Sequence, residues 1–294
     1  MRADLGSLIR AAGRVLAEAG VPSPEHDARA LAAHVLGVPQ VHTLASVPAS
    51  FTARYAELVE RRRSREPLQH IVGTTAFRHL RLRVEPGVFV PRPETELVAQ
   101  VAIDEARGLI DRGPAPLVVD LCCGAGGIAI AVAVEVPGAR VTAVDVSADA
   151  VALTVTNATA CGAEIRTAVV DATATDALAD LTGLADVVAA NPPYIPPDAE
   201  PLEPEVRDHD PDLALYGGGM DGLEVPGGVV RTAARLLRVG GLLVMEHGES
   251  QGEAVRDLVS ASGFMGARTL PDLAGRPRMV VARRMPRSPH ATRA

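Results

Sequence analysis

From residue 116 onward, short apolar runs alternate with helical stretches, and this alternation limits the possible folds more than any other feature. The apolar runs that predict strands are 117–121, 140–145, 165–170, 186–190, 241–246 and 279–283. The stretches that predict helices are 126–135, 148–161, 227–238 and 250–262. Strand–helix alternation is typical of parallel sheets with a helical layer on each face. We therefore predict an α/β fold with an open, mainly parallel, doubly wound sheet.

The first part of the chain has a different pattern. Apolar residues recur at helical spacing from Leu5 to Leu16, Pro24 is suited to the first turn of a second helix, and residues 52–65 predict a third. Residues 67–93 then alternate around Glu85-Pro86-Gly87, which predicts a β-hairpin. We predict a small helical bundle at 1–66, a hairpin linker at 67–93, the α/β domain at 94–285, and a disordered polar tail at 286–294.

Composition excludes several classes of protein. The chain of 294 residues has a net charge of −7, which does not favour direct binding of nucleic acid. Its three cysteines, Cys122, Cys123 and Cys161, form neither a disulfide framework nor a metal-binding pattern. No apolar run reaches the roughly 20 residues of a membrane span. We therefore expect a cytoplasmic protein with no metal site and no membrane contact.

The first predicted strand leads into a turn of small residues, Cys122-Cys123-Gly124-Ala125-Gly126, and then into a helix. Small residues let a backbone approach a ligand closely, and the helix adds unpaired N–H groups. The turn lacks the full GxGxxG pattern of dinucleotide sites. Asp120, just before it, suits an ammonium group better than a pyrophosphate. The methionine part of S-adenosylmethionine carries such an ammonium, although a tight structural turn would give the same pattern.

Two further aspartates end the next strands. Asp145 follows the second strand, where an acidic residue binds ribose hydroxyls in nucleotide-binding sheets. Asp171 follows the third, where it would meet an adenine amino group. Each alone is explained equally well as a helix cap or an exposed turn residue. Together they predict a binding site for S-adenosyl-L-methionine at the carboxyl edge of the sheet.

The fourth strand runs directly into Asn191-Pro192-Pro193-Tyr194. The prolines fix φ and remove two N–H donors, while their carbonyls and the Asn191 side chain remain as acceptors. Such acceptors hold a planar amide or amino nitrogen by its N–H groups and direct its lone pair at a methyl donor. A rigid turn that ends a strand is the structural alternative. We predict that these four residues are catalytic.

With these residues identified, the chain resembles the bacterial protein-(glutamine-N5) methyltransferase family, which modifies peptide chain release factors. Besides the strand-end residues above, the motifs that carry the resemblance are Pro67 to Gly73, Val90 to Glu96, Glu205 to Asp208, Ala214 to Gly218, Asp221 to Leu223, and Glu246 to Gly248. The segment Pro91-Arg92-Pro93-Glu94-Thr95-Glu96 and the order of the whole set are more specific than Asn-Pro-Pro-Tyr alone.

The resemblance implies a Rossmann-like class I S-adenosylmethionine-dependent methyltransferase whose N-terminal helical domain helps to hold the release factor. Its substrate would be the glutamine of the Gly-Gly-Gln loop. The cofactor would contact residues 122–126, Asp145 and Asn191, and residues 191–194 would bind the substrate glutamine. We also expect a monomer. Cys122 and Cys123 depart from the family turn Gly-Thr-Gly-Ser/Thr-Gly, and the role of Glu246-His247 is left open.

Two rival functions remain at this point. One is a methyltransferase of the same chemistry that acts on a ribosomal protein, DNA or RNA, and the other is a non-enzymatic module that binds the cofactor. The intact Asn-Pro-Pro-Tyr segment argues against the second. The basic cluster Arg61-Arg62-Arg63 with Arg65 most simply predicts a solvated helix end, although contact with an acidic partner surface or with ribosomal RNA is an alternative.

Overall fold

The computed structural model describes residues 4–42, 47, 50–110 and 112–286. The chain forms two compact units. The helical unit comprises Met1–Thr74 and Pro201–His209, and the sheet unit comprises Thr75–Glu200 and Asp210–Ala294. Most of the tail predicted to be disordered, from residue 287 on, lies outside the described residues.

The helical unit is built from short amphipathic helices. They are α1 (Leu5–Glu18), α2 (Pro24–Leu36), α3 (Phe51–Arg63), α4 (Leu68–Val72) and α8 (Pro204–His209). Asp4 caps α1 by accepting a hydrogen bond from Ser7 N at 3.0 Å. The apolar faces meet in a core that includes Leu5, Leu16, Leu31, Phe51 and Leu58. The helical spacing read from the sequence is therefore the spacing that builds this core.

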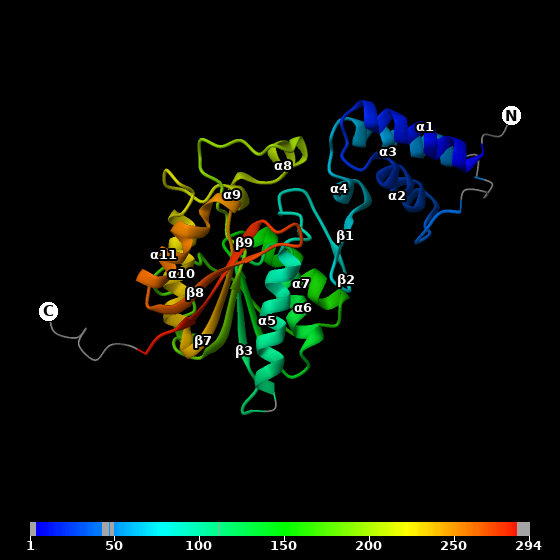
Figure 1. Ribbon diagram of the computed structural model, residues 1–294. Coiled ribbons are helices and arrows are strands. Elements are labelled where there is room, and N and C mark those ends of the chain that lie inside the picture. Colours follow the sequence, from blue (N-terminus) through cyan, green and yellow to red (C-terminus); the bar gives the residue numbers. More distant parts are fainter. Residues whose placement is uncertain (1–3, 43–46, 48–49, 111, 287–294) are drawn as a thin grey trace. The chain divides into compact units, whose positions relative to one another are not determined.

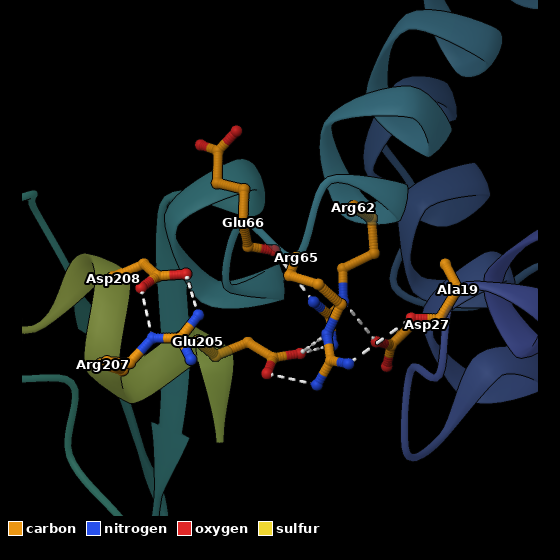
Figure 2. Close-up of polar contacts among 8 residues, drawn as sticks. All are labelled: Ala19, Asp27, Arg62, Arg65, Glu66, Glu205, Arg207 and Asp208. Carbon is orange, nitrogen blue, oxygen red and sulfur yellow. Dashed lines mark hydrogen bonds and ion pairs between the residues drawn. The ribbon is translucent and has the colours of Figure 1, made fainter. Parts of the chain in front are cut away.

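The basic cluster at the end of α3 is neutralised within the same unit, so the interpretation as a solvated helix end is wrong for its inner members. Figure 2 shows Arg62 and Arg65 pointing toward Glu205 and Asp27. Arg62 bonds Asp27 at 2.7 Å and Glu205 at 2.7 Å, and Arg65 bonds Glu205 at 2.5 Å. Arg63 fits the solvated interpretation, with a half-exposed pair to Glu60, and the partly exposed Arg61 pairs with Glu66. We name Asp27, Arg62, Arg65 and Glu205 the arginine cluster.

The sheet unit holds a seven-stranded sheet of order β5-β4-β3-β6-β7-β9-β8, shown in Figure 1. Its strands are β3 (Leu117–Leu121), β4 (Arg140–Asp145), β5 (Arg166–Val169), β6 (Ala185–Ala190), β7 (Leu237–Glu246), β8 (Phe264–Pro271) and β9 (Pro277–Arg284). Strands β5, β4, β3, β6 and β7 are parallel, and β9 and β8 run antiparallel to their neighbours. The sheet is therefore mainly parallel, as predicted.

Helices cover both faces of this sheet, as expected for a doubly wound fold (Figure 1). On one face lie α5 (Thr95–Ile110), α6 (Gly127–Glu135) and α7 (Ala148–Ala160). On the other lie α10 (Glu224–Leu236) and α11 (Gly252–Ala261). Strand β3 is buried on both faces, because Val118 packs under the first layer while Val119 and Leu121 pack under the second. Two 3₁₀ turns, Ala179–Leu181 and Glu249–Gln251, and the short α9 (Asp212–Leu215) complete the unit.

The hairpin differs from the prediction in the position of its turn. Strands β1 (Thr74–Phe77) and β2 (Leu80–Arg83) are joined at Arg78 and His79, and Glu85-Pro86-Gly87 lies beyond the second strand. Arg78 adopts a positive φ of 54° there. Its N–H donates to Glu96 at 2.8 Å and its guanidinium pairs with Glu135 at 2.6 Å. Contacts distant in sequence thus set a turn that the local Pro-Gly signal did not mark.

Within the described part of the chain, no helix has the length and apolar character that crossing a membrane requires.

Candidate active site

Four parallel strands bring the predicted site residues to one edge of the sheet. In register, Leu121 lies beside Val144 on one side and Ala190 on the other, and Asp145 lies beside Val169. The chain runs outward from β3 through β4 to β5 and then returns to place β6 on the other side of β3. This is a topological switch point, where sheets of this class bind their ligands. Residues 122–126, Asp145, Asp171 and residues 191–194 all follow strands that end at this edge.

The turn after β3 is shaped by its backbone. Cys122, Gly124 and Gly126 have φ values of 66°, 54° and 86°. A Cβ on Gly126 would lie 2.9 Å from the Ile130 and Thr154 side chains, so only glycine fits there. A Cβ on Gly124 would meet no atom within 4 Å, which leaves open space in front of the turn. Cys123 is buried and lies 3.6 Å from the Thr154 hydroxyl, and Asn157 donates to the Ala125 carbonyl at 2.9 Å.

Asp145 holds this turn in place. Its two carboxylate oxygens accept hydrogen bonds from Gly124 N at 2.9 Å and Ser147 N at 3.0 Å. Ser147, not Asp145, caps α7 by accepting from Ala150 N. The capping alternative for Asp145 is therefore wrong, and its carboxylate instead links the ends of β3 and β4.

Carboxyl groups gather around the turn. Asp120 is fully buried, and its Oδ2 accepts from Ala129 N at 3.0 Å while its Oδ1 has no hydrogen-bond partner among the described residues. Burial, together with the charge of Asp145, raises the pKa of Asp120 to about 8, although the hydrogen bond from Ala129 N opposes this shift. Burial, followed by the charges of Asp145, Asp120 and Asp171, also raises the pKa of the Cys122 thiol. Burial likewise raises the pKa of the Cys123 thiol, so neither thiol of the turn is a thiolate nucleophile near neutral pH.

Asp171 makes only local contacts, unlike Asp120 and Asp145, which bond the turn and helix after β3. It is exposed, and its Oδ1 accepts from the Thr173 hydroxyl at 2.7 Å and from Thr173 N at 2.8 Å. These bonds lower its pKa. It lies at the predicted edge but is engaged in a local turn.

These residues fit S-adenosylmethionine. The space in front of Gly124 admits a ligand close to the backbone, and Asp145 ends the neighbouring strand. Asp120, which the sequence suggested for an ammonium, is instead buried, and its raised pKa keeps it largely protonated near neutral pH. Among the described residues, no group of three or more His, Cys, Asp or Glu side chains is arranged to hold a metal ion.

The backbone of residues 191–194 is fixed by the segment 215–222 and by Gln251. Tyr194 N and Ile195 N donate to the Leu215 carbonyl at 3.2 Å and 2.8 Å. Gln251 Nε2 donates to the Tyr194 carbonyl at 2.8 Å. A Cβ on Gly222 would lie 2.3 Å from that same carbonyl oxygen, so the two segments touch through bare backbone.

The side chains of Asn191 and Tyr194 join one buried polar chain. Asn191 Nδ2 donates to Thr95 Oγ1 at 3.1 Å, and Thr95 Oγ1 donates to Glu246 Oε2 at 2.7 Å. The Tyr194 hydroxyl donates to Glu246 Oε1 at 3.3 Å. Burial raises the pKa of Glu246 to about 7, and burial together with the Glu246 charge raises that of Tyr194. Asn191 Nδ2 therefore faces Thr95, and Asn191 Oδ1 faces the other way.

Glu246 and His247 are adjacent in sequence but make different contacts. Glu246 touches the site residues, because β6 and β7 pair in register at Ala190 and Met245 and their next residues are neighbours. His247 is fully buried, its Nδ1 lies 2.8 Å from the Gly248 carbonyl, and burial lowers its pKa. The lowered pKa keeps His247 uncharged near neutral pH.

Sequence reasoning missed the roles of Thr95, Gln251 and Gly222. Thr95 and Gly222 lie in motifs that carried the family resemblance. The motifs marked these positions, but the sequence did not indicate what the two residues do. Gln251 lies in a 3₁₀ turn after β7 and had no signal.

Comparison with known families agrees with this geometry. Residues 7–73 match the family model described as PrmC N-terminal domain, and residues 100–201 match the methyltransferase small domain. A solved methyltransferase from Pyrococcus furiosus has the same fold, with a TM-score of 0.51 and 14% identity over 72% of this chain and 92% of that one. At that identity the likeness shows the fold alone.

Curated relatives are much more similar in sequence. A release factor glutamine methyltransferase from Streptomyces coelicolor is 49% identical over 92% of this chain and 94% of its own length. One from Bifidobacterium longum is 42% identical over 94% and 98%. A 4-amino-L-phenylalanine/4-methylamino-L-phenylalanine methyltransferase from Streptomyces pristinaespiralis is 43% identical over 81% and 80%. The chain therefore belongs to the release factor glutamine methyltransferase family, whose methyl donor is S-adenosylmethionine.

Proposed function

We propose that this enzyme transfers a methyl group from S-adenosylmethionine to the side-chain amide nitrogen of the glutamine in the Gly-Gly-Gln loop of peptide chain release factors. The observation that carries the proposal is the acceptor group at the end of β6. Asn191 Oδ1 points away from Thr95, and proline N–H groups are absent beside it. Relatives named for this reaction, over nearly the full length of the chain, support the same substrate.

The catalytic work assigned to residues 191–194 is positioning. Asn191 Oδ1 and a proline carbonyl would accept the two N–H groups of the substrate amide and hold its nitrogen in one orientation. Tyr194 would pack against the planar amide, and its raised pKa keeps its hydroxyl protonated. The fixed dipoles cost no reorganisation during the reaction. No general base is required, because the amide proton leaves after the nitrogen has gained the methyl group.

The cofactor supplies an electrophilic methyl on a sulfonium. In this proposal, Cys122, Cys123, Gly124, Ala125 and Gly126 line its binding site with their backbone. Asp145 binds the ribose hydroxyls, Asp171 binds the adenine amino group, and Asn191 contacts both cofactor and substrate.

The helical unit is proposed to recognise the release factor, as its match to the PrmC N-terminal domain supports. We further propose a cytoplasmic monomer that does not bind nucleic acid. The three thiols are unpaired, which fits a reducing compartment, and the net charge of −7 disfavours a polyanion.

A small aromatic amine is a second candidate substrate. The relative from Streptomyces pristinaespiralis is named for methylation of 4-amino-L-phenylalanine, whose nitrogen is also conjugated with a planar π system. The same acceptors would hold it. A ribosomal protein, DNA or RNA remains a third class with the same chemistry.

The deciding experiment incubates the full chain and labelled S-adenosylmethionine with a release factor from the same organism. A Gln→Ala variant of the Gly-Gly-Gln loop is the matched control. We expect label on the wild-type factor only. If label appears on 4-amino-L-phenylalanine or on ribosomal fractions and not on the factor, the release factor is not the substrate and the labelled compound takes its place.

A further inference from the structure

We propose that Thr95 and Glu246 are positioning residues that fix the polarity of the Asn191 amide, so that its oxygen and not its nitrogen faces the substrate. This inference rests on the proposed function and specifies how the site selects an amide. It assigns a task to two residues that lie far apart in sequence, at the start of α5 and the end of β7.

The Thr95 hydroxyl has a single proton to donate. A carboxylate only accepts hydrogen bonds, so an ionised Glu246 takes the Thr95 proton at 2.7 Å. The Thr95 oxygen then has only lone pairs to offer, and the neighbour that satisfies it is the Asn191 NH₂ at 3.1 Å. Asn191 Oδ1 is left as an acceptor for the substrate N–H groups. Without these hydrogen bonds from Asn191 through Thr95 to Glu246, both orientations of the asparagine amide fit the same space.

Protonation of Glu246 would reverse this order. A neutral carboxyl can donate to Thr95, which frees the Thr95 proton to point at Asn191 and favours the flipped amide. The flipped amide would present N–H groups to the N–H groups of the substrate. The direction of every bond in the chain therefore depends on one negative charge.

Several groups set that charge. Tyr194 donates to the other oxygen of Glu246, and the charge of Arg278 on β9 lowers the Glu246 pKa while that of Glu94 raises it. Arg278 itself lies 3.6 Å from Asp272. Burial is the largest influence, and the resulting pKa of about 7 means that the charge is lost on mild acidification. Because the active form is the ionised one, activity falls as pH drops through this value.

The first test compares Thr95→Val, Thr95→Ser and, as a matched control, Thr142→Val, at another buried threonine on β4. We expect Thr95→Val to lower kcat for the release factor by about 10–100-fold, with cofactor affinity unchanged. Thr95→Ser keeps the hydroxyl and restores most of the rate, and Thr142→Val leaves kcat unchanged.

The second test uses amide selectivity. A release factor with Gln→Glu in its Gly-Gly-Gln loop is used as a competitive inhibitor, because a carboxylate repels the Asn191 oxygen but suits its nitrogen. For each enzyme, the affinity for the Gln→Glu factor is divided by the affinity for the wild-type factor. We expect this ratio to be higher in Thr95→Val and in Glu246→Gln than in the unmodified enzyme. The kcat–pH profile of the unmodified enzyme falls below about pH 7, and that of Glu246→Gln is flat there.

The outcomes separate this inference from the proposed function. If the unmodified enzyme does not methylate the factor, the proposed function fails. If it does, and Thr95→Val keeps both the full kcat and the full selectivity, the polarity inference is overturned. Should Thr95→Val not fold, a flat pH profile of the unmodified enzyme, or an unchanged profile in Glu246→Gln, overturns it equally.

Discussion

Cys122 is one of four non-glycine residues in the described part of the chain with a positive φ. With a φ of 66° it lies in the left-handed region, which costs a non-glycine residue about 1–2 kcal/mol. Its neighbours in the turn that share a positive φ, Gly124 and Gly126, carry no such cost. The protein therefore tolerates local strain in the turn where the cofactor is predicted to bind.

Replacing Cys122 by glycine should relieve this strain. Since glycine also makes the unfolded chain more flexible, we expect a net gain of about 0.5–1 kcal/mol in the free energy of unfolding. Denaturant titration without cofactor measures it. Cys161→Gly is the control, because Cys161 has a φ of −90° and should lose stability instead. Equal effects of the two substitutions would contradict the strain argument.

Among the elements, α3 shows how adjacent arginines differ in their contribution. The side chain of Arg62 is 5% exposed and bonds both Asp27 and Glu205, whereas that of Arg63 is 53% exposed and bonds only Glu60. Removing one partner of a buried pair leaves an uncompensated charge, which an exposed pair does not.

We expect Arg62→Ala to destabilise the helical unit by about 3–5 kcal/mol, and Arg63→Ala to cost less than about 1 kcal/mol. Thermal unfolding followed by circular dichroism compares them directly. Similar melting temperatures for the two variants would show that the arginine cluster adds no stability.

The same cluster predicts an acid dependence. Burial opposes ionisation of Glu205, but the hydrogen bonds from Arg65 and Arg62 outweigh it and lower the pKa of Glu205 to about 2. A lowered carboxyl pKa stabilises the fold above its unfolded value, near 4.5, and this stability is lost as pH falls toward 2. In Glu205→Gln, the decline of melting temperature between these values should be shallower than in the unmodified protein.

Elements with strong local patterns were predicted well from the sequence, and those set by distant contacts were not. Strands β3 and β4 have the predicted bounds, because both are mainly apolar and their central residues are buried. Strand β8 was missed, since its residues are mostly exposed or half-buried and show no clear alternation. The hairpin turn was misplaced because Arg78 is held by Glu96 and Glu135, which no local pattern reveals.

The site was predicted in the same uneven way. Residues at strand ends, such as Asn191 and Asp145, could be placed together because the parallel topology brings strand ends to one edge, and their binding roles stay predictions. Thr95 begins a helix and Glu246 ends β7, and their contact across 151 positions of sequence depends on how α5 packs on the sheet. Neither the orphaned Asp120 oxygen nor the direction of the Asn191 amide has any signature in sequence.

At the scale of the whole molecule, the chain passes between the two units more than once. It leaves the helical unit after Thr74, returns to it for Pro201–His209, and re-enters the sheet unit at Asp210. In the sequence, the returning segment begins a few residues after Tyr194 and ends a few residues before Leu215. The Leu215 carbonyl accepts hydrogen bonds from Tyr194 N and Ile195 N. Segment 201–209 is thus fastened to the helical unit by Glu205 while its flanks belong to the sheet unit.

This arrangement predicts protection from proteases. Arg207 is exposed, but cleavage after it requires local opening of the segment. Glu205→Ala removes the bonds to Arg62 and Arg65 and should speed native-state trypsin cleavage at Arg207 several-fold, as measured by mass spectrometry. Glu203→Ala, at an exposed position of the same segment, is the control and should leave the rate unchanged. Equal acceleration in both variants would mean that Glu205 does not hold the segment.

The return of the chain has a consequence for how such proteins are built and rebuilt. A recognition unit that was continuous in sequence would be exchangeable as a cassette, by recombination or in the laboratory. Here the stretch up to Thr74 would arrive in a new host without Glu205, the acidic partner of its two innermost arginines. A functional chimera would therefore need two separate transplants, the second of only nine residues, Pro201–His209, inserted beyond the Asn-Pro-Pro-Tyr segment of the host.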